Sequence, residues 1–251
     1  MRGEAEAGTK VLNASSEDAV LGLFDGGYNS VAACILHAGA ARTAFLRKLP
    51  ASQWTLAKSD RDIASMEIIA LTSLPPQGRE DAADILVRAL SHCPSAWKDL
   101  PSARAEVETF LGDSDRVAWA GVAEGRVIGW IGAIRQSAFA WELHPLVVDP
   151  AHQRRGCGTR LVAALEAAAR DSDVITIWLG ADDDFGGTNL FGRDLYPDVL
   201  DQLSRLAPSG TGHAHTFYRR LGYSVVGVLP DINGVGRHDI LMAKRLDSPP
   251  V

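Results

Sequence analysis

The sequence has only three cysteines among its 251 residues, and they are scattered as Cys34, Cys93 and Cys157. An odd number of widely spaced cysteines excludes a framework of paired disulfides and is typical of a reducing compartment, so we expect a cytoplasmic protein. No group of cysteines and histidines has the spacing of a zinc site, and we expect no metal. His213 and His215 are two residues apart, which would place them on different faces of a helix.

No apolar run reaches the ~20 residues that a membrane-spanning helix needs. Acidic Glu4 and Glu6 come first and no apolar core with a cleavage site follows, so we expect no secretory signal peptide. The sequence also lacks the Gly-Lys-Ser/Thr ending of a P-loop and the G-x-G-x-x-G of a dinucleotide-binding turn. We therefore expect no membrane association and neither of these two nucleotide sites.

Positive charge is not in excess either. The formal net charge is −6, and residues 1–65 hold seven basic and seven acidic side chains, so all of the net charge belongs to residues 66–251. An acidic domain attracts cations and repels nucleic acid. This distribution favours a cationic ligand over a nucleic acid, although mild acidity also serves solubility alone.

The chain divides near a second methionine, Met66. Residues 1–65 are rich in alanine and glycine and predict only one helix, Val31–Leu49, so we interpret them as a peripheral or disordered extension. From Met66 onward, apolar periodicity predicts alternating strands and helices, which indicates the α/β (α+β) class. The expected strands are Glu67–Leu74, Val117–Ala123, Arg126–Arg135, Trp141–Val148, Val174–Leu179, Val225–Leu229 and Asp239–Lys244, and the expected helices are Arg79–Leu90, Ser102–Leu111, Thr159–Arg170, Tyr196–Leu206 and Ala214–Leu221.

The most informative segment is a basic, glycine-containing turn between a strand and a helix. The apolar run Leu146–Val148 ends at Asp149-Pro150, and Gln153–Gly158 leads into the next helix. At a helix N-terminus the free N–H groups and the dipole favour an anion, and glycines allow the backbone to come close to it. Arg154 and Arg155 would add charge-assisted hydrogen bonds. The turn therefore predicts a pyrophosphate site, whereas an ordinary surface turn is the simpler alternative.

The spacing of Gln153, Gly156 and Gly158 resembles the acetyl-coenzyme A loop of the Gcn5-related N-acetyltransferase superfamily. Other segments stand in the order found in one branch of it, the aminoglycoside 6'-N-acetyltransferases. These segments are Trp141–Pro145 (WELHP), Ile175–Asp184, Gly187–Tyr196, Phe217–Tyr223 and Val226–Arg245. One departure is Ala181, where relatives often have threonine, so any contact of that hydroxyl is absent.

The resemblance implies a mixed central sheet flanked by helices, with residues 66–251 as the acetyltransferase domain. It also implies acetyl-coenzyme A as co-substrate and an aminoglycoside as acceptor, and it leaves the oligomeric state open, a homodimer included. The residues expected to hold the coenzyme are Leu146, Val147, Val148, Gln153, Arg154, Arg155, Gly156, Cys157, Gly158, Thr159 and Tyr218.

Tyr218 matches the family tyrosine that faces the coenzyme sulfur. A phenol can protonate or hydrogen-bond a leaving thiolate, although a helix-borne tyrosine often only packs. The oxyanion would be held by a backbone N–H on the strand before the loop, either that of Leu146 or that of Val148.

Glu142 and His144 lie two apart on the same strand and therefore on one face, which regular alternation would extend to Leu146 and Val148. Glu142 can hold the acceptor amine or relay its proton through water, and a neutral His144 can do the same. The alternatives are a solvated carboxylate at a strand end and a core histidine bonded to the backbone.

Asp182, Asp183 and Asp184 follow the next strand at its C-terminal end, where α/β sheets generally place ligands. Clustered carboxylates would bind the ammonium groups of an aminoglycoside, although an acidic triplet is usually a solvated turn. Asp239 on the last strand is a further candidate. Trp97 is expected to line one wall of the acceptor site.

Two other functions remain open. The first is an acetyltransferase of the same fold that acts on a polyamine or a peptide amine. The second is a non-catalytic coenzyme A-binding module, against which the intact loop and Tyr218 both argue.

Overall fold

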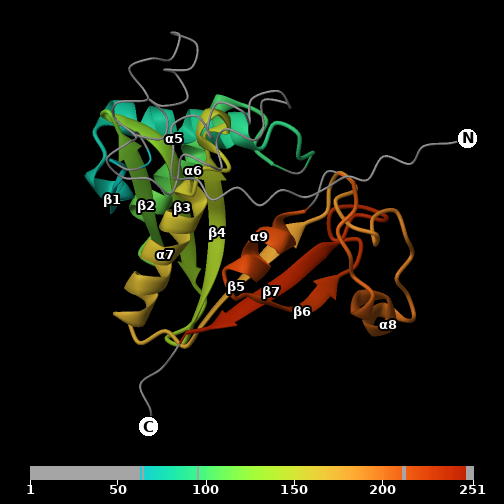
Figure 1. Ribbon diagram of the computed structural model, residues 1–251. Coiled ribbons are helices and arrows are strands. Elements are labelled where there is room, and N and C mark those ends of the chain that lie inside the picture. The colour runs from blue at the N-terminus through green and yellow to red at the C-terminus, as the bar shows by residue number, and fades with distance from the viewer. Residues whose placement is uncertain (1–62, 64, 95, 211–212, 247–251) are drawn as a thin grey trace, which may run out of the picture. The chain divides into compact units, whose positions relative to one another are not determined.

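The computed structural model describes residues 63, 65–94, 96–210 and 213–246, and the helix expected at Val31–Leu49 lies outside them. Within this part, seven strands form one mixed sheet in the order β1-β2-β3-β4-β5-β7-β6 (Figure 1). They are β1 (Glu67–Ala70), β2 (Arg116–Ala123), β3 (Arg126–Arg135), β4 (Ala140–Val148), β5 (Thr176–Asp182), β6 (Ser224–Leu229) and β7 (Asp239–Arg245). The predicted fold class and the mixed sheet are confirmed.

The described helices are α5 (Pro76–Ala89), α6 (Leu100–Gly112), α7 (Cys157–Arg170), α8 (Val199–Ser204) and α9 (Ala214–Arg220). Helices α5 and α6 cover one face of β2–β4, whereas α7 covers the other face and α9 lies over β5 and β7 (Figure 1). One buried cluster lies on the face that α7 and α9 cover, and a second lies between α5, α6 and strands β2–β4. No helix in the described ranges is both long and apolar enough to cross a membrane.

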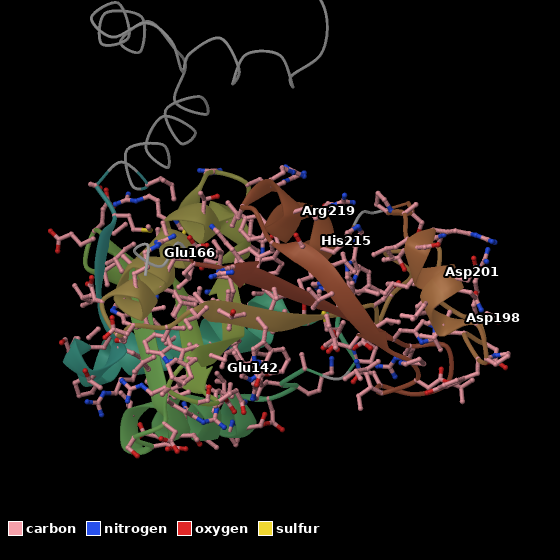
Figure 2. All side chains as sticks on the ribbon, turned by 90° about the horizontal axis from the view of Figure 1, so that it is seen from below. Glu142, Glu166, Asp198, Asp201, His215 and Arg219 are labelled. Carbon is pink, nitrogen blue, oxygen red and sulfur yellow. The ribbon has the colours of Figure 1, made fainter. Side chains whose placement is uncertain are left out.

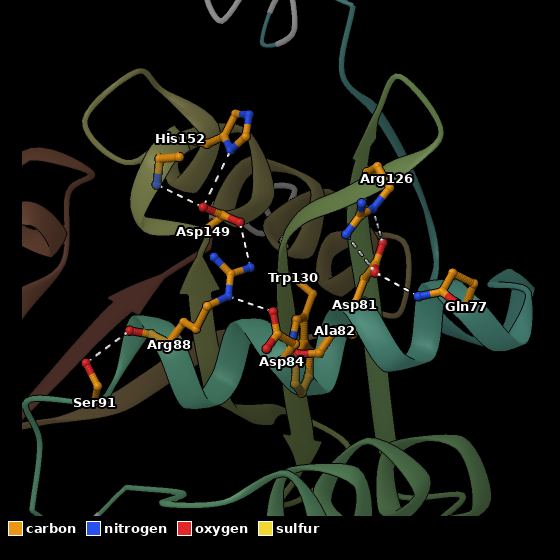
Figure 3. Close-up of polar contacts among 11 residues, drawn as sticks. Gln77, Asp81, Ala82, Asp84, Arg88, Ser91, Arg126, Trp130, Asp149 and His152 are labelled. Carbon is orange, nitrogen blue, oxygen red and sulfur yellow. Dashed lines mark hydrogen bonds and ion pairs between the residues drawn. The ribbon is translucent and has the colours of Figure 1, made fainter.

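Helix α5 is fixed to the sheet by buried side chains and by polar contacts at its edges (Figure 3). The indole of Trp130, fully buried on β3, donates to the carbonyl of Ala82 at 3.1 Å. Arg126 at the start of β3 donates to both oxygens of Asp81 at 2.8 and 3.1 Å. These contacts hold α5 against β3, close to the strand that carries the candidate catalytic residues.

Several predicted boundaries are wrong by a few residues. Helix α5 begins at Pro76 rather than Arg79, and β5 ends at Asp182 rather than Leu179. The first strand ends at Ala70, because Leu71–Ser73 turns into a 3-10 helix that buries Leu71 beside α5. The helix expected at Tyr196–Leu206 is only α8, since the chain beyond it turns back and Ala207 pairs with Asn189 through two hydrogen bonds. Helix α7 begins at Cys157, two residues before the predicted start.

The sequence suggested a domain boundary at Met66, but the folded domain already includes Ile63. Ile63 is buried in the cluster under α7, and the Met66 side chain occupies the space beside Gly121. The guanidinium of Arg160 on α7 donates to the carbonyls of both Ile63 and Met66. Ile63 is therefore part of the folded unit.

A chain that begins at Met66 is expected to fold and to be active but to be less stable than one that begins at Lys58. Burial of an isoleucine side chain contributes roughly 2 kcal/mol, and Arg160 would also lose one carbonyl acceptor. For a domain of this size, that loss lowers the melting temperature by roughly 4–8 °C. Calorimetry on the two chains measures the difference, and equal melting temperatures would show that Ile63 contributes nothing.

Candidate active site

The sheet opens between β4 and β5. These parallel strands pair only at Ala140–Glu142 with Thr176–Trp178, although β4 continues to Val148 and β5 to Asp182. Beyond the paired positions the two strands diverge, and the two halves of the sheet splay apart (Figure 1). The inner edges of both strands are therefore free of sheet partners and line a gap.

Two backbone N–H groups of β4 are directed into this gap. Asp149 donates to Ile128 of β3 at 2.9 Å, so its N–H points toward β3. Because successive N–H groups of a strand alternate between its two edges, those of Leu146 and Val148 point away from β3. They are the two donors that the sequence singled out for an oxyanion.

The predicted face of Leu146 and Val148 is wrong, because β4 contains a β-bulge. Ala133 is opposite Leu143, but Ile131 is opposite Leu146, so β4 contains one extra residue at His144-Pro145. Glu142 and His144 share one face, as expected. The extra residue moves the side chains of Leu146 and Val148 to the other face, where they pack with the cluster under α7.

The predicted coenzyme loop has the geometry of an anion site. Gly156 caps α7 with φ of +92°, a left-handed conformation that favours glycine, and it has no Cβ to obstruct an approaching group. The helix then starts at Cys157, so the first N–H groups of α7 have no partner within the helix. Nη1 of Arg155 is buried and makes no hydrogen bond among the described residues, whereas Gln153 donates to Val148 O at 3.0 Å. A pyrophosphate fits these donors.

Cys157 in this loop is a packing residue rather than a reactive thiol. Its side chain is buried with Sγ at 3.4 Å from Sδ of Met66. Burial raises the pKa of its thiol to about 11, so the reactive thiolate is scarce near neutral pH. Only the backbone of Cys157 is left to contact a ligand.

The strand end that leads into the loop is anchored from α5 (Figure 3). The Asp149 carboxylate accepts from the N–H of Ala151 at 2.8 Å and from Nη2 of Arg88 at 2.8 Å. The same guanidinium donates to Asp84 at 2.6 Å. The hydrogen bond to Arg88 helps to hold the pKa of Asp149 below its ordinary value, against the opposing effect of burial. Arg88 is a positioning residue that the sequence analysis missed.

Tyr218 on α9 is buried in the cluster that also contains α7 and β5. Its neighbour Phe217 reaches the first turn of α7, with Cζ at 3.4 Å from the Cβ that Gly158 lacks. Helix α9 therefore lies against the loop and the gap. Burial raises the pKa of Tyr218, so its hydroxyl keeps its proton.

His213 and His215 do not lie on different faces of a helix as expected. His213 caps α9 with extended backbone, which brings the two Nδ1 atoms within 3.0 Å of each other. The Nε2 atom of His213 lies 3.0 Å from the carbonyl of Asp182. The pair therefore fixes the start of α9 to the end of β5.

Glu142, His144 and Trp97 lie together on the face of the sheet opposite α7, and Figure 2 shows Glu142 away from Glu166 of that helix. The ring centroids of Trp97 and His144 are 5.8 Å apart, so the two side chains are neighbours. The carboxylate of Glu142 accepts from Gln136 at 2.7 Å. Burial lowers the pKa of His144, which keeps the imidazole neutral near pH 7 and able to accept a proton.

Glu106 on α6 is a second residue that the sequence analysis missed. Its Oε1 lies 3.7 Å from Nε2 of His144 and accepts from Arg116 at 3.0 Å. A carboxylate there favours a charged imidazole and opposes the effect of burial on the pKa of His144. No sequence signal identifies Glu106, because it belongs to an amphipathic helix and meets His144 only through tertiary packing.

Asp182 and Asp239 are register partners on β5 and β7, so their side chains lie on the same face of the sheet. This face, opposite to the buried Ala181 and Ile240, is called the open face below. Asp182 is exposed and accepts from the amide of Asn233. The Asp239 carboxylate lies over Gly180, with Oδ2 only 2.1 Å from the Cβ that Gly180 lacks. This glycine admits the acid, which makes Gly180 a further residue that the sequence did not reveal.

The other two aspartates of the triplet are engaged within the protein. Asp183 is fully buried and accepts from the N–H groups of Gly187 and Thr188 at 2.7 and 3.0 Å, and from the Thr188 hydroxyl at 2.6 Å. The Asp184 side chain is also buried and pairs with Arg237 at 2.6 Å. The expectation that both bind substrate does not agree with these positions, because their oxygens hold the loop after β5.

This arrangement of free backbone donors beside a loop with the geometry of an anion site can be compared with proteins of known structure. One of these is an aminoglycoside 6'-N-acetyltransferase whose structure was solved with coenzyme A. The two chains are 36% identical with a TM-score of 0.67, and the match covers 74% of this chain and 100% of that one. The chain belongs to the GNAT family of acetyltransferases. Residues 82–194 also match the family described as "Acetyltransferase (GNAT) family".

Other proteins that the chain is similar to differ in their identity and coverage. The aminoglycoside 6'-N-acetyltransferase from Enterococcus faecium is 36% identical with a TM-score of 0.66, and the match covers 74% of this chain and 100% of that one. The ribosomal-protein-S18-alanine N-acetyltransferase from Escherichia coli is 16% identical with a TM-score of 0.51, over 74% and 96% of the two chains, and shares the fold. An uncharacterized N-acetyltransferase encoded in the lysA 3' region of Bacillus methanolicus is 29% identical over 91 residues, which are 36% of this chain and 75% of that protein.

For this acetyltransferase we expect Tyr218→Phe to lower kcat by about 10²-fold, with little change in either KM, because the variant keeps the packed ring and removes only the hydroxyl. Tyr223→Phe is the matched control, since Tyr223 is also buried and its ring centroid lies 5.6 Å from that of Tyr218. Steady-state kinetics and melting curves of both variants provide the comparison. Full activity of Tyr218→Phe would make Tyr218 a packing residue.

Proposed function

We propose that this acetyltransferase moves the acetyl group of acetyl-coenzyme A to the 6'-amine of an aminoglycoside and thereby confers resistance. The observation that carries the proposal is the acidic open face beside the gap, to which Glu142, Asp182 and Asp239 contribute from three strands. Trp97 and the neutral imidazole of His144 border it. Such a surface suits an acceptor that carries several ammonium groups.

The coenzyme would be held at two places. The first turn of α7, the left-handed Gly156 and the guanidinium of Arg155 would hold the pyrophosphate, and the free edge of β4 would hold the pantetheine arm. When bound, acetyl-coenzyme A supplies a thioester carbonyl as the acetyl donor. The N–H groups of Leu146 and Val148 then stand ready for the oxygen of that carbonyl as it gains charge.

The acceptor amine must lose a proton before it can attack. His144 is held neutral by burial and can take that proton, and Glu142 can orient the ammonium group or pass the proton on through water. Tyr218 is protonated at all working pH values and can donate its O–H hydrogen bond to the departing thiolate. These three assignments are proposals that rest on the positions of the residues.

The test is a pair of aminoglycosides that differ at the reacting position. Neomycin has a 6'-amine and paromomycin has a hydroxyl there, with the rest of the molecule unchanged. We expect acetyl-coenzyme A-dependent acetylation of neomycin and kanamycin and none of paromomycin. Expression in a susceptible bacterium should raise resistance to the first two antibiotics only.

A polyamine is the second candidate acceptor, because the same carboxylates suit spermidine. A peptide amine lacks the repeated positive charge that the acidic face favours. Spermidine and a peptide panel belong in the same assay. Preferred turnover of either over kanamycin would overturn the aminoglycoside assignment while leaving the acetyltransferase activity intact.

A further inference from the structure

The Asp239 carboxylate occupies a position in the sheet that only a glycine beneath it allows. Its carboxylate projects across β5 over the exposed Gly180, where any other residue would place a Cβ 2.1 Å from Oδ2. Its other oxygen, Oδ1, is inaccessible to solvent and makes no hydrogen bond among the described residues. The carboxyl group is therefore partly buried, and it lies beside Asp182 on the open face.

The charges around Asp239 are nearly all negative. Asp182 faces it from β5, Glu142 from β4 and Asp184 from the loop that follows β5. The guanidinium of Arg237 is held by Asp184, and Asn233 brings only an uncharged amide to Asp182. Burial is the main reason that the pKa of Asp239 rises to about 7, the acidic neighbours add to it, and hydrogen bonding from the backbone of Ala181 opposes it.

We propose that Asp239 is a specificity-determining residue that keeps a proton while no acceptor is bound and releases it when an ammonium group of a polycationic acceptor binds. The inference rests on the proposed function and adds a proton-linked anchor to it. The neutral acid would be replaced by a carboxylate paired with the ammonium, and the proton would pass to solvent. Charge and protons are balanced, and no other reactant is needed.

Proton release sets the dependence of acceptor binding on pH. Below pH 7 the entering ammonium must displace the proton of Asp239, and each pH unit below its pKa then costs up to about tenfold in affinity. Above pH 7 the carboxylate is already ionised and binds at full strength. Asp239→Asn resembles the neutral acid, so the variant should match the wild type near pH 6 and bind kanamycin about tenfold more weakly near pH 8.

Calorimetric titration with kanamycin in the presence of coenzyme A measures both affinity and protons. Heats in buffers of different ionisation enthalpy give the number of protons released, and the difference between wild type and Asp239→Asn removes the contribution of the antibiotic's own amines. We expect the wild type to release about half a proton more than the variant near pH 6.5, because a tenfold difference in affinity lowers the pKa of Asp239 by about one unit on binding. The same number of protons in both proteins would overturn the proposal.

Two glycine substitutions test whether the position of the Asp239 carboxylate over β5 matters. Gly180→Ala keeps Asp239 but forces its carboxylate away, so the variant should lose the extra proton release and the gain in affinity at pH 8. Gly227→Ala adds the same methyl group on neighbouring β6, where its closest contact is Leu241 at 3.5 Å, and should behave as the wild type. Wild-type binding by Gly180→Ala would contradict the proposal.

The protonation of Asp239 before an acceptor binds is tested directly. Carbon-13 NMR of the aspartate carboxyl groups, assigned with Asp239→Asn, follows its titration directly. A midpoint near pH 7 is expected, and an ordinary midpoint near pH 4 would overturn the inference. Absence of kanamycin binding by the wild type, by contrast, would overturn the proposed aminoglycoside activity and would leave this titration as the decisive measurement for Asp239.

Discussion

Asp183→Asn should lower the free energy of unfolding by about 3 kcal/mol, because an NH2 group would replace an acceptor that now takes two hydrogen bonds from Thr188. Asp183 is fully buried, so water cannot satisfy the donors that are left. The melting temperature should fall by roughly 6–12 °C. Differential scanning calorimetry measures both quantities.

The adjacent Asp182 gives the matched comparison. Its side chain is exposed, so Asp182→Asn should change stability by no more than about 0.5 kcal/mol. The same change should raise the KM for the aminoglycoside about tenfold, with the KM for acetyl-coenzyme A unchanged. If Asp183→Asn raised only the aminoglycoside KM and left the melting temperature unchanged, Asp183 would be a substrate ligand after all.

Gly158→Val should raise the KM for acetyl-coenzyme A by at least about tenfold, a loss of about 1.4 kcal/mol in binding, while the protein stays folded. The Cβ at this position would meet Phe217 at 3.4 Å and Val148 at 3.8 Å, which are ordinary contacts. The two methyl groups beyond it would fill the space between α7, α9 and β4, where we propose that the coenzyme binds. Initial-rate kinetics with varied acetyl-coenzyme A provide the measurement.

Two variants control for effects unrelated to the coenzyme. Gly158→Ala places only the tolerated Cβ and should change this KM little. Ala163→Val introduces the same β-branched side chain on an exposed position of α7 and should leave both KM values unchanged. An unchanged KM in a folded Gly158→Val protein would show that the coenzyme does not follow this path.

The sequence predicted the elements that depend on local pattern. Apolar periodicity located most strands and helices within a few residues, since a strand or helix must turn its apolar face toward the core. The spacing of Gln153, Gly156 and Gly158 predicted a turn with free N–H groups before α7, because the left-handed φ of Gly156 and the start of the helix are consequences of local chain chemistry. That this turn holds the coenzyme remains a proposal. The family followed from several such segments in one order.

Tertiary structure decided which side chains share a site. The bulge at His144-Pro145 moves Leu146 and Val148 to the opposite face, and nothing in the alternation of β4 announces the extra residue. Three adjacent aspartates are indistinguishable in the sequence, but only Asp182 is exposed. Asp183 accepts from Gly187 and Thr188 in the loop after β5, and Asp184 pairs with Arg237, which precedes β7. Asp239 gains its raised pKa from burial over Gly180 and from carboxylates on other elements. The conformation of a turn or a helix start depends on neighbouring residues in the sequence. The burial of a side chain and the charges around it depend on which distant segments the fold brings together.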